Sequence, residues 1–182
     1  MLKSSLIALS LSLGLGASSA FAGMMVGGAE MFPAKNIIEN AVNSKDHTTL
    51  VAAVKAAGLV ETLRGDGPFT VFAPTNDAFG ALPAGTVDGL LKPEAKATLT
   101  KVLTCHVIAA NAMSDAVMKM VDDDGGMHKV KTVGGCELTL KYKDGKVMVE
   151  DETGGIATVT IADVAQSNGV IHVIDKVLLP KM

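Results

Sequence analysis

The fold of this chain is decided by the stretch Phe69-Thr70-Val71-Phe72-Ala73-Pro74-Thr75-Asn76-Asp77-Ala78-Phe79. Its first half, from Phe69 to Ala73, is rich in aromatic and β-branched residues, which predicts a short strand buried on both faces. Pro74 has no N–H group to donate within a sheet and therefore ends the strand. The side-chain oxygens of residues 75–77 favour the N-terminus of a helix that starts near Ala78. We expect a buried strand that turns directly into a helix.

A second apolar segment runs from Val170 to Leu179 and contains the nearly uninterrupted sequence Val-Ile-His-Val-Ile. An edge strand would not tolerate such a run without charges, so the pattern predicts a central strand. We expect this strand to share one hydrophobic interior with Phe69 to Ala73. Further strands are predicted by alternating apolar residues at 129–133, 137–142 and 157–164, and Asp144-Gly145 is typical of a two-residue hairpin turn.

Helical spacing of apolar residues dominates the earlier part of the chain. The predicted helices run from Pro33 to about Val42, from a cap at Asp46 to a stop at Gly58, over residues 86–91, from Pro93 to about Leu103, and from a Ser114 cap to about Val121. Thr104 to Ile108 is predicted to be a strand. Because helices come first and most strands follow, the expected class is α+β rather than alternating α/β.

The first 22 residues have the features of a secretory signal peptide. Lys3 is their only charge, residues 6–15 are apolar, and Ala20-Phe21-Ala22 is typical of a cleavage site. Cleavage after Ala22 removes 22 of the 182 residues and leaves 160, which is enough for one domain. We interpret residues 23–31 as a flexible tether and residues 32–182 as the domain. No apolar segment reaches the roughly 20 residues of a membrane span, so we expect a periplasmic or extracellular protein.

The composition argues against a nucleic-acid-binding protein. The chain has 16 basic and 19 acidic residues, a formal charge of −3, and loss of Lys3 with the signal peptide makes this −4. It has one Tyr, no Trp and a single arginine, Arg64, so it has no cluster of arginines. A nucleic-acid-binding surface is usually basic and studded with aromatic residues. We therefore expect no nucleic-acid partner.

Cys105 and Cys136 are the only two cysteines. An even number of cysteines in an exported chain favours a disulfide, and closing the 31-residue separation would stabilise the fold by about 3 to 4 kcal/mol. Two alternatives stay open at this point: two buried thiols, or a redox pair. The second lacks the Cys-x-x-Cys spacing that is typical of redox-active cysteines.

Three blocks of sequence resemble the fasciclin (FAS1) family. The residues at 70–79 match its first motif, Leu103 to Val107 lies where its central Tyr-His motif falls, and Asn168 to Asp175, continuing to Pro180, matches its second motif. The motif residues to which the resemblance gives a structural role are Phe72, Pro74, Thr75, Asn76, Asp77, Phe79, His106, Asn168, Gly169, His172 and Asp175. The resemblance covers about residues 32–180.

The resemblance implies a wedge of β-sandwich-like strands with a helical layer, and a role in extracellular adhesion or in matrix and carbohydrate contact. The chain departs from the family at Cys105, which stands where a tyrosine normally precedes the motif histidine. The resemblance implies that members which bind integrins use that tyrosine and its apolar neighbours. The Arg-Gly-Asp sequence at 64–66 is sufficiently explained as a turn with Gly67 and Pro68, so we do not expect integrin binding.

His106 and His172 both lie within apolar segments. They could be catalytic bases or metal ligands, but we interpret them as buried histidines that are each satisfied by a hydrogen bond. An unpaired buried imidazole would cost about 1 to 3 kcal/mol. We therefore hypothesise that Asn76 or Asp77 is the partner of one of them.

No catalytic residue is predicted, because neither a Gly-x-Ser-x-Gly nor a His-Glu-x-x-His pattern occurs. The acidic clusters at 122–124 and 150–152 lack the spacing of a calcium loop and are interpreted as solvated charge. Met118, Met120, Met127 and His128 offer soft copper ligands, but the same methionines are explained by a buried helix face and by scatter. We predict no metal and no cofactor.

The sequence therefore predicts an exported, non-enzymatic binding or adhesion module of one domain. Its partner would be an unidentified protein or polysaccharide at the cell surface, and its oligomeric state is left open. The alternative is a periplasmic protein that binds a small ligand or a metal.

Overall fold

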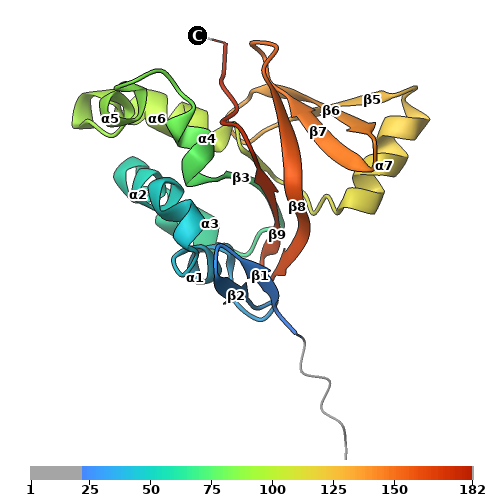
Figure 1. Ribbon diagram of the computed structural model, residues 1–182, viewed down its shortest axis with the longest axis horizontal. Coiled ribbons are helices and arrows are strands. Elements are labelled where there is room, and N and C mark those ends of the chain that lie inside the picture. Colours follow the sequence, from blue (N-terminus) through green and yellow to red (C-terminus); the bar gives the residue numbers. More distant parts are fainter. Residues whose placement is uncertain (1–21, 182) are drawn as a thin grey trace, which may run out of the picture.

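A seven-stranded sheet forms the centre of the computed structural model, which describes residues 22–181 (Figure 1). Its strand order is β4-β3-β9-β8-β7-β6-β5. These strands are β3 (Phe69–Pro74), β4 (Val107–Ile108), β5 (Met127–Lys131), β6 (Glu137–Lys143), β7 (Lys146–Glu150), β8 (Ile156–Gln166) and β9 (Gly169–Ile174). All neighbours are antiparallel except β3 and β9, which run parallel from the Phe69–Gly169 pair to the Pro74–Ile174 pair.

Helices cover the sheet unequally. The helices and 3₁₀ turns are α1 (Ile37–Ala41), η1 (Lys45–His47), α2 (Thr48–Ala57), α3 (Val60–Arg64), α4 (Asn76–Gly80), α5 (Thr86–Leu90), η2 (Pro93–Ala95), α6 (Lys96–Thr104) and α7 (Ser114–Asp123). In Figure 1 the first six helices form a layer on one side, and α7 lies on the other side beside β5, β6 and β7. Among the described residues, no helix is long and apolar enough to span a bilayer. The predicted α+β class is confirmed.

Two hydrophobic clusters use opposite faces of the central strands. Val71 and Val173 belong to the cluster under the helical layer, whereas Phe72 and Ile174 belong to the cluster under α7. This division follows from the two-residue period of a strand, which sends neighbouring side chains to opposite faces. The second cluster also contains Leu140 from β6, so the curved sheet encloses it on two sides. The predicted sandwich-like arrangement is therefore present within one sheet.

The central stretch folds as predicted. Residues Thr70 to Pro74 are all buried, and β9 lies between β3 and β8 as a central strand. The side-chain oxygen of Thr75 accepts a hydrogen bond of 3.3 Å from the N–H of Ala78 and caps α4. The two segments that we expected to meet in one interior are thus hydrogen-bonded neighbours.

The hairpin between β6 and β7 also forms as predicted. Asp144 and Gly145 have φ angles of 52° and 78°. Two consecutive positive φ angles match the right-handed twist of the flanking strands, which explains why this dipeptide specifies the turn.

The predicted tether at residues 23–31 is wrong. Residues 24–31 form a hairpin of β1 (Met24–Val26) and β2 (Ala29–Met31), and the side chains of Val26 and Met31 are 1% exposed. The carbonyl of Gly27 accepts a hydrogen bond from the N–H of Lys45, which holds the hairpin against η1. The folded unit therefore begins before residue 32, whereas the predicted signal peptide lies almost entirely outside the described residues.

Three other expectations about element ends are corrected. Helix α1 begins at Ile37, not at Pro33, because the side chain and main chain of Asn36 form a capping box with Glu39. Asp46 does not cap α2 but lies in η1. The predicted strand at 104–108 is reduced to β4, because α6 continues through Thr104.

Candidate functional site

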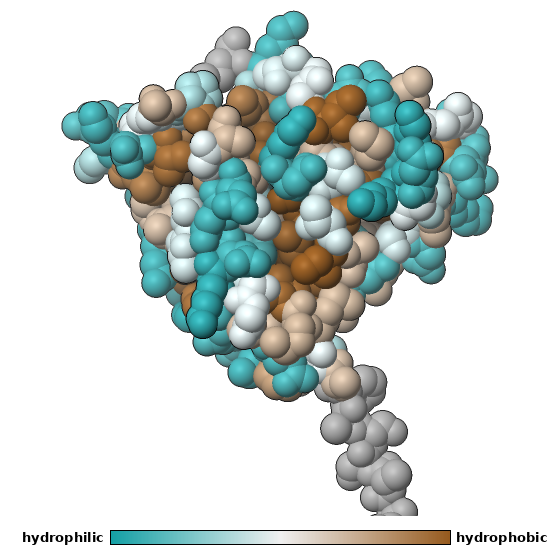
Figure 2. Space-filling view, viewed as in Figure 1, coloured by the Kyte–Doolittle hydropathy of each residue, from teal (hydrophilic) through white to brown (hydrophobic). Residues whose placement is uncertain are grey.

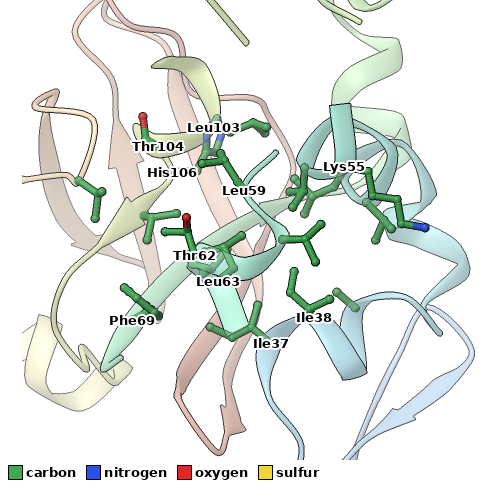
Figure 3. A pocket seen from close by; sticks show the side chains of 18 of the residues that line it. Ile37, Ile38, Lys55, Leu59, Thr62, Leu63, Phe69, Leu103, Thr104 and His106 are labelled. Carbon is green, nitrogen blue, oxygen red and sulfur yellow. The ribbon is translucent and has the colours of Figure 1, made fainter. Parts of the chain in front are cut away.

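An apolar cleft lies between the helical layer and the sheet (Figure 3). Its walls come from α1, α2, α3 and α6 and from β3 and β4, and its volume is about 50 Å³. The lining side chains that best define it are Ile38, Val51, Leu59, Leu63, Phe69 and Leu103. The helices do not fill this cleft, because α2 ends before Gly58. The left-handed φ of 76° at Gly58 turns the chain away before α3 begins. The arrangement suits an apolar group.

Only four lining residues carry polar side-chain atoms, and three of them cannot offer a charge. Thr62 is exposed, and the hydroxyl of Thr104 donates to the carbonyl of Thr100 at 2.7 Å. Figure 3 shows Lys55 at one end, with its nitrogen directed outward, and His106 near Leu103, away from Lys55. The His106 imidazole is buried and internally bonded, so Lys55 supplies the positive charge of the cleft.

Both ring nitrogens of His106 are used within the fold. Nδ1–H donates to the carbonyl of Val102 at 2.8 Å, and Nε2 accepts from the N–H of Leu178 at 2.9 Å. Burial lowers the pKa of His106 to about 4, although the Val102 carbonyl and the Asp151 carboxylate oppose the shift. The histidine is therefore neutral at pH 7 and joins the end of α6 to the C-terminal segment.

This pKa predicts that acid weakens the fold. Below pH 6.5 the unfolded chain takes up a proton at His106, but the folded chain does so only near pH 4. Stability therefore falls as pH decreases through this window, by about 2 kcal/mol between pH 6.5 and 5 for His106 alone. Burial also lowers the pKa values of His47 and His172, which adds to the same trend. Urea unfolding of the wild type and of His106→Gln at pH 7 and 5 measures the contribution of His106 to this pH dependence. An equal decrease in the free energy of unfolding from pH 7 to pH 5 in both proteins would contradict the prediction.

His172 is likewise satisfied by the main chain. Nε2–H donates to the carbonyl of Ala112 at 2.7 Å, and Nδ1 accepts from the N–H of Asp163 at 3.2 Å. The hydroxyl of Ser114 donates to the carboxylate of Asp163. Serine, aspartate and histidine thus lie near one another, but the imidazole has no nitrogen left to accept the serine proton. This connectivity is structural and does not form a nucleophile–base pair.

The hypothesis that Asn76 or Asp77 bonds to a motif histidine is wrong. Asn76 accepts from the N–H of Thr49 at 3.0 Å and donates to the carbonyl of Lys45 at 2.8 Å, so it joins α4 to the start of α2. Asp77 is exposed in the first turn of α4, where a negative charge is favourable. Asn76 therefore positions the helical layer, and Asp77 is a solvent-exposed residue of α4.

The second motif holds the helical layer onto the sheet through Asn168. Its side chain accepts from the N–H of Ile37 at 3.0 Å and donates to the carbonyls of Leu63 and Gly65 at 2.8 Å each. His172 stacks on Phe72, with ring centroids 5.8 Å apart. The two motifs therefore meet across the β3–β9 pair. Asp175 accepts from the N–H of Thr158 at 2.7 Å, beyond the end of β9.

Cys105 and Cys136 form the predicted disulfide. Their Cα atoms are 5.4 Å apart, and each residue is 1% exposed. The bond joins the C-terminal end of α6 to the start of β6, and no cysteine in the described part of the chain is free. The alternatives of free thiols and of a redox pair are not supported by this buried, bonded arrangement.

A second groove lies beside the β6–β7 hairpin. It measures about 290 Å³, and both polar and apolar side chains line it. Its polar members are Ser114, Tyr142, Lys146 and Thr160, and Met118 of α7 lies with them. Tyr142 is 39% exposed and is the only tyrosine of the chain. An open groove with an aromatic ring and hydroxyl groups can contact a polar, ring-shaped ligand.

The acidic residues at 122–124 and the nearby methionines do not form a common metal site in the described part of the chain. Asp123 and Asp124 pair on the surface with Lys119 and His128, as solvated charge would. Met120 packs on the cluster under α7, whereas Met127 is 54% exposed. Between residues 22 and 181, no group of three or more His, Cys, Asp or Glu side chains is placed to hold a metal ion.

Asp151 differs from the expectation of solvated charge, because its residue is only 7% exposed. One carboxylate oxygen accepts from the N–H groups of Thr153 and Gly155, and the other accepts from the N–H of Leu179 at 2.8 Å. Asp151 thus fixes the β7–β8 turn to the C-terminal segment. The sequence signal was an aspartate two residues before a Thr-Gly-Gly turn, a pattern typical of side-chain capping of a turn.

Comparison with known proteins decides the family. The model of the fasciclin domain matches residues 45–180. The chain belongs to the fasciclin family. Its relatives include Protein sll1483 of Synechocystis sp., which is 53% identical over 149 residues, covering 82% of this chain and 76% of the relative. Cell surface glycolipoprotein MPB83 of Mycobacterium bovis is 37% identical over 145 residues, covering 77% of this chain and 58% of the relative.

A solved structure supports the fold of this fasciclin domain. The pair of FAS1 domains from the insect cell adhesion molecule fasciclin I aligns with a TM-score of 0.57 and 24% identity, covering 71% of this chain and 43% of the insect chain. The similarity at this level of identity concerns the fold. One relative of the fasciclin domain thus bears the name of a cell surface protein, and the domain spans 58% of that relative's length.

Proposed function

We propose that this fasciclin domain is an exported, non-enzymatic adhesion module that contacts a polysaccharide at the cell surface. The observation that carries the proposal is the groove beside the β6–β7 hairpin. Tyr142 offers an exposed ring and Lys146 an exposed cation in a groove of about 290 Å³. Thr160 is also exposed there, and its hydroxyl, which donates to the carbonyl of Val173, can accept a hydrogen bond. A sugar presents hydroxyl groups to such polar side chains and an apolar ring face to an aromatic one.

The bonding of the motif histidines supports a role without catalysis. A general base needs a nitrogen that can reach the proton of a substrate or nucleophile. Both nitrogens of His106 and both of His172 are engaged with the main chain. The residues that the family motifs supply are therefore used to hold the fold, and binding is left to the surface.

Export is supported by three observations. The first 22 residues have the features of a signal peptide, and the two cysteines form a disulfide, which persists in oxidising compartments. A relative bears the name cell surface glycolipoprotein. We infer a periplasmic or extracellular location for the domain.

Binding to glycans tests the proposal. We expect the purified domain to bind a subset of polysaccharides on a glycan panel, and Tyr142→Ala to weaken that binding about tenfold, as expected for an aromatic residue at the centre of an interface. Met127→Ala is the matched control, because Met127 is also an exposed apolar residue but lies on β5, outside the groove. Equal binding by the wild type and Tyr142→Ala would exclude the groove as the contact surface.

A further inference from the structure

The apolar cleft has exposed walls that the fold leaves uncovered. Val42 and Val133 both line it, and they are 48% and 47% exposed. Val42 ends α1, and Val133 lies in the loop between β5 and β6, so elements distant in sequence both expose a valine there. Figure 2 shows that hydrophobic surface gathers between the helical side and the strands on the face in view. The cleft is therefore a place where an apolar ligand would remove hydrophobic surface from water.

The charge of the cleft is confined to one end. Lys55 is exposed at that end, and none of the ion pairs formed within residues 22–181 involves it. Away from that end, the neutral imidazole of His106 has both nitrogens bonded internally. A ligand in this cleft thus meets apolar walls and one cation at the mouth.

This distribution selects a class of ligand. A polyol would leave hydroxyl groups without hydrogen-bond partners against the apolar walls, and a cationic ligand would be repelled by Lys55. An alkyl chain matches the walls, and one carboxylate at its end matches the ammonium group of Lys55. We propose that the cleft binds an alkyl carboxylate of the fatty-acid type, with the chain between the helical layer and β3 and the carboxylate at Lys55. This site is separate from the groove beside Tyr142 and does not rest on the proposed glycan contact.

Calorimetry tests whether the alkyl chain enters the cleft. The ligands are saturated carboxylates of six to twelve carbons, used below their micelle concentrations. Each methylene that enters the cleft is expected to strengthen binding about fourfold. The gain should stop when the chain is longer than the cleft. No detectable binding of any member of the series, or an affinity that does not depend on chain length, would overturn the proposal.

Two variants test the placement. Lys55→Gln is expected to weaken decanoate binding about two- to fivefold and to leave 1-decanol binding unchanged, because only the carboxylate uses the ammonium group. Thr62→Trp places a large side chain in the cleft from an exposed position of α3 and should abolish binding of both probes. Lys143→Gln, at the distant β6–β7 hairpin, is the matched control and should bind both probes as the wild type does.

Far-UV circular dichroism and the melting temperature establish that each variant is folded. Undiminished binding by folded Thr62→Trp would place the ligand elsewhere and overturn the assignment. Equal loss of decanoate and decanol in Lys55→Gln would overturn the role of the cation. Glycan binding by Thr62→Trp should equal that of the wild type, so failure of this inference is distinguishable from failure of the proposed adhesion function.

Discussion

Replacing Gly169 with alanine is expected to lower the free energy of unfolding by about 3 to 5 kcal/mol. Gly169 opens β9 and pairs with Phe69 at the start of β3, so it lies where the two family motifs join. A Cβ atom on Gly169 would lie against the Phe69 carbonyl oxygen and 2.8 Å from its carbonyl carbon and its nitrogen. These are main-chain atoms of a central strand, which cannot move aside as a flexible side chain could.

The backbone conformation adds to this cost. Gly169 has a φ of +156°, which residues with a side chain rarely adopt. Relief by shifting β9 would disturb the bonds of the adjacent Asn168, whose side chain holds α1 and α3 to the sheet. The variant should therefore lose stability in the helical layer as well as in the sheet.

Gly89→Ala is the matched control for this substitution. Gly89 lies in α5, has no strained φ, and has open space where a Cβ atom would be placed. Alanine there is expected to leave stability unchanged or to raise it by about 0.5 to 1 kcal/mol, because glycine is unfavourable within a helix. Urea unfolding of the three proteins at pH 7 measures the difference. A Gly169→Ala variant as stable as Gly89→Ala would show that the β3–β9 contact is not as close as described.

The sequence predicts those parts of the fold that are specified by residues close together in the chain. The apolar runs of β3 and β9 require burial on both faces wherever they lie, and Asp144-Gly145 specifies its own turn. Gly58 likewise ends α2 through its own backbone conformation. Each of these signals lies within a few residues, so no knowledge of distant contacts is needed.

The errors occur where a distant segment decides the local structure. Three glycines within residues 23–31 suggested a flexible tether, yet Val26 and Met31 are buried by the helices that follow them. Asp151 lies in a run of three acidic residues, which suggests exposure to solvent. Its carboxylate nevertheless accepts a hydrogen bond from the N–H of Leu179 in the C-terminal segment. At 104–108 the apolar residues fit a strand as well as the end of a helix, and the main-chain bonds of α6 decided the outcome.

The candidate sites were harder to predict than the fold. The apolar cleft arises because four helices fail to fill the space above β3, which is a property of their packing and not of any motif. In the sequence, the residues that line the cleft cannot be told apart from ordinary core residues. In the structure, the exposure of Val42 and Val133 distinguishes the cleft from the closed core. The motif residues, by contrast, were recognised by resemblance, and the structure uses them to hold elements together.

Removal of the disulfide is expected to lower the free energy of unfolding by about 3 to 4 kcal/mol. The bond closes a separation of 31 residues, and a cross-link of that length restricts the unfolded chain by this amount on the chain-entropy model. It also fixes the end of α6, and with it His106 and the wall of the cleft at Leu103, to β6. The double variant Cys105→Ala, Cys136→Ala should therefore be destabilised and should bind cleft ligands more weakly.

The reduced wild type separates the cross-link from the packing of the sulfur atoms, because reduction breaks the bond but keeps both side chains. In urea unfolding with a thiol reductant at pH 8, the wild-type midpoint should fall close to that of the double variant, whose own midpoint should not respond to the reductant. The residual difference reports the small cavity that alanine leaves at two fully buried positions. A wild-type midpoint that is the same with and without reductant, once mass measurement shows two free thiols, would contradict the predicted contribution of the bond.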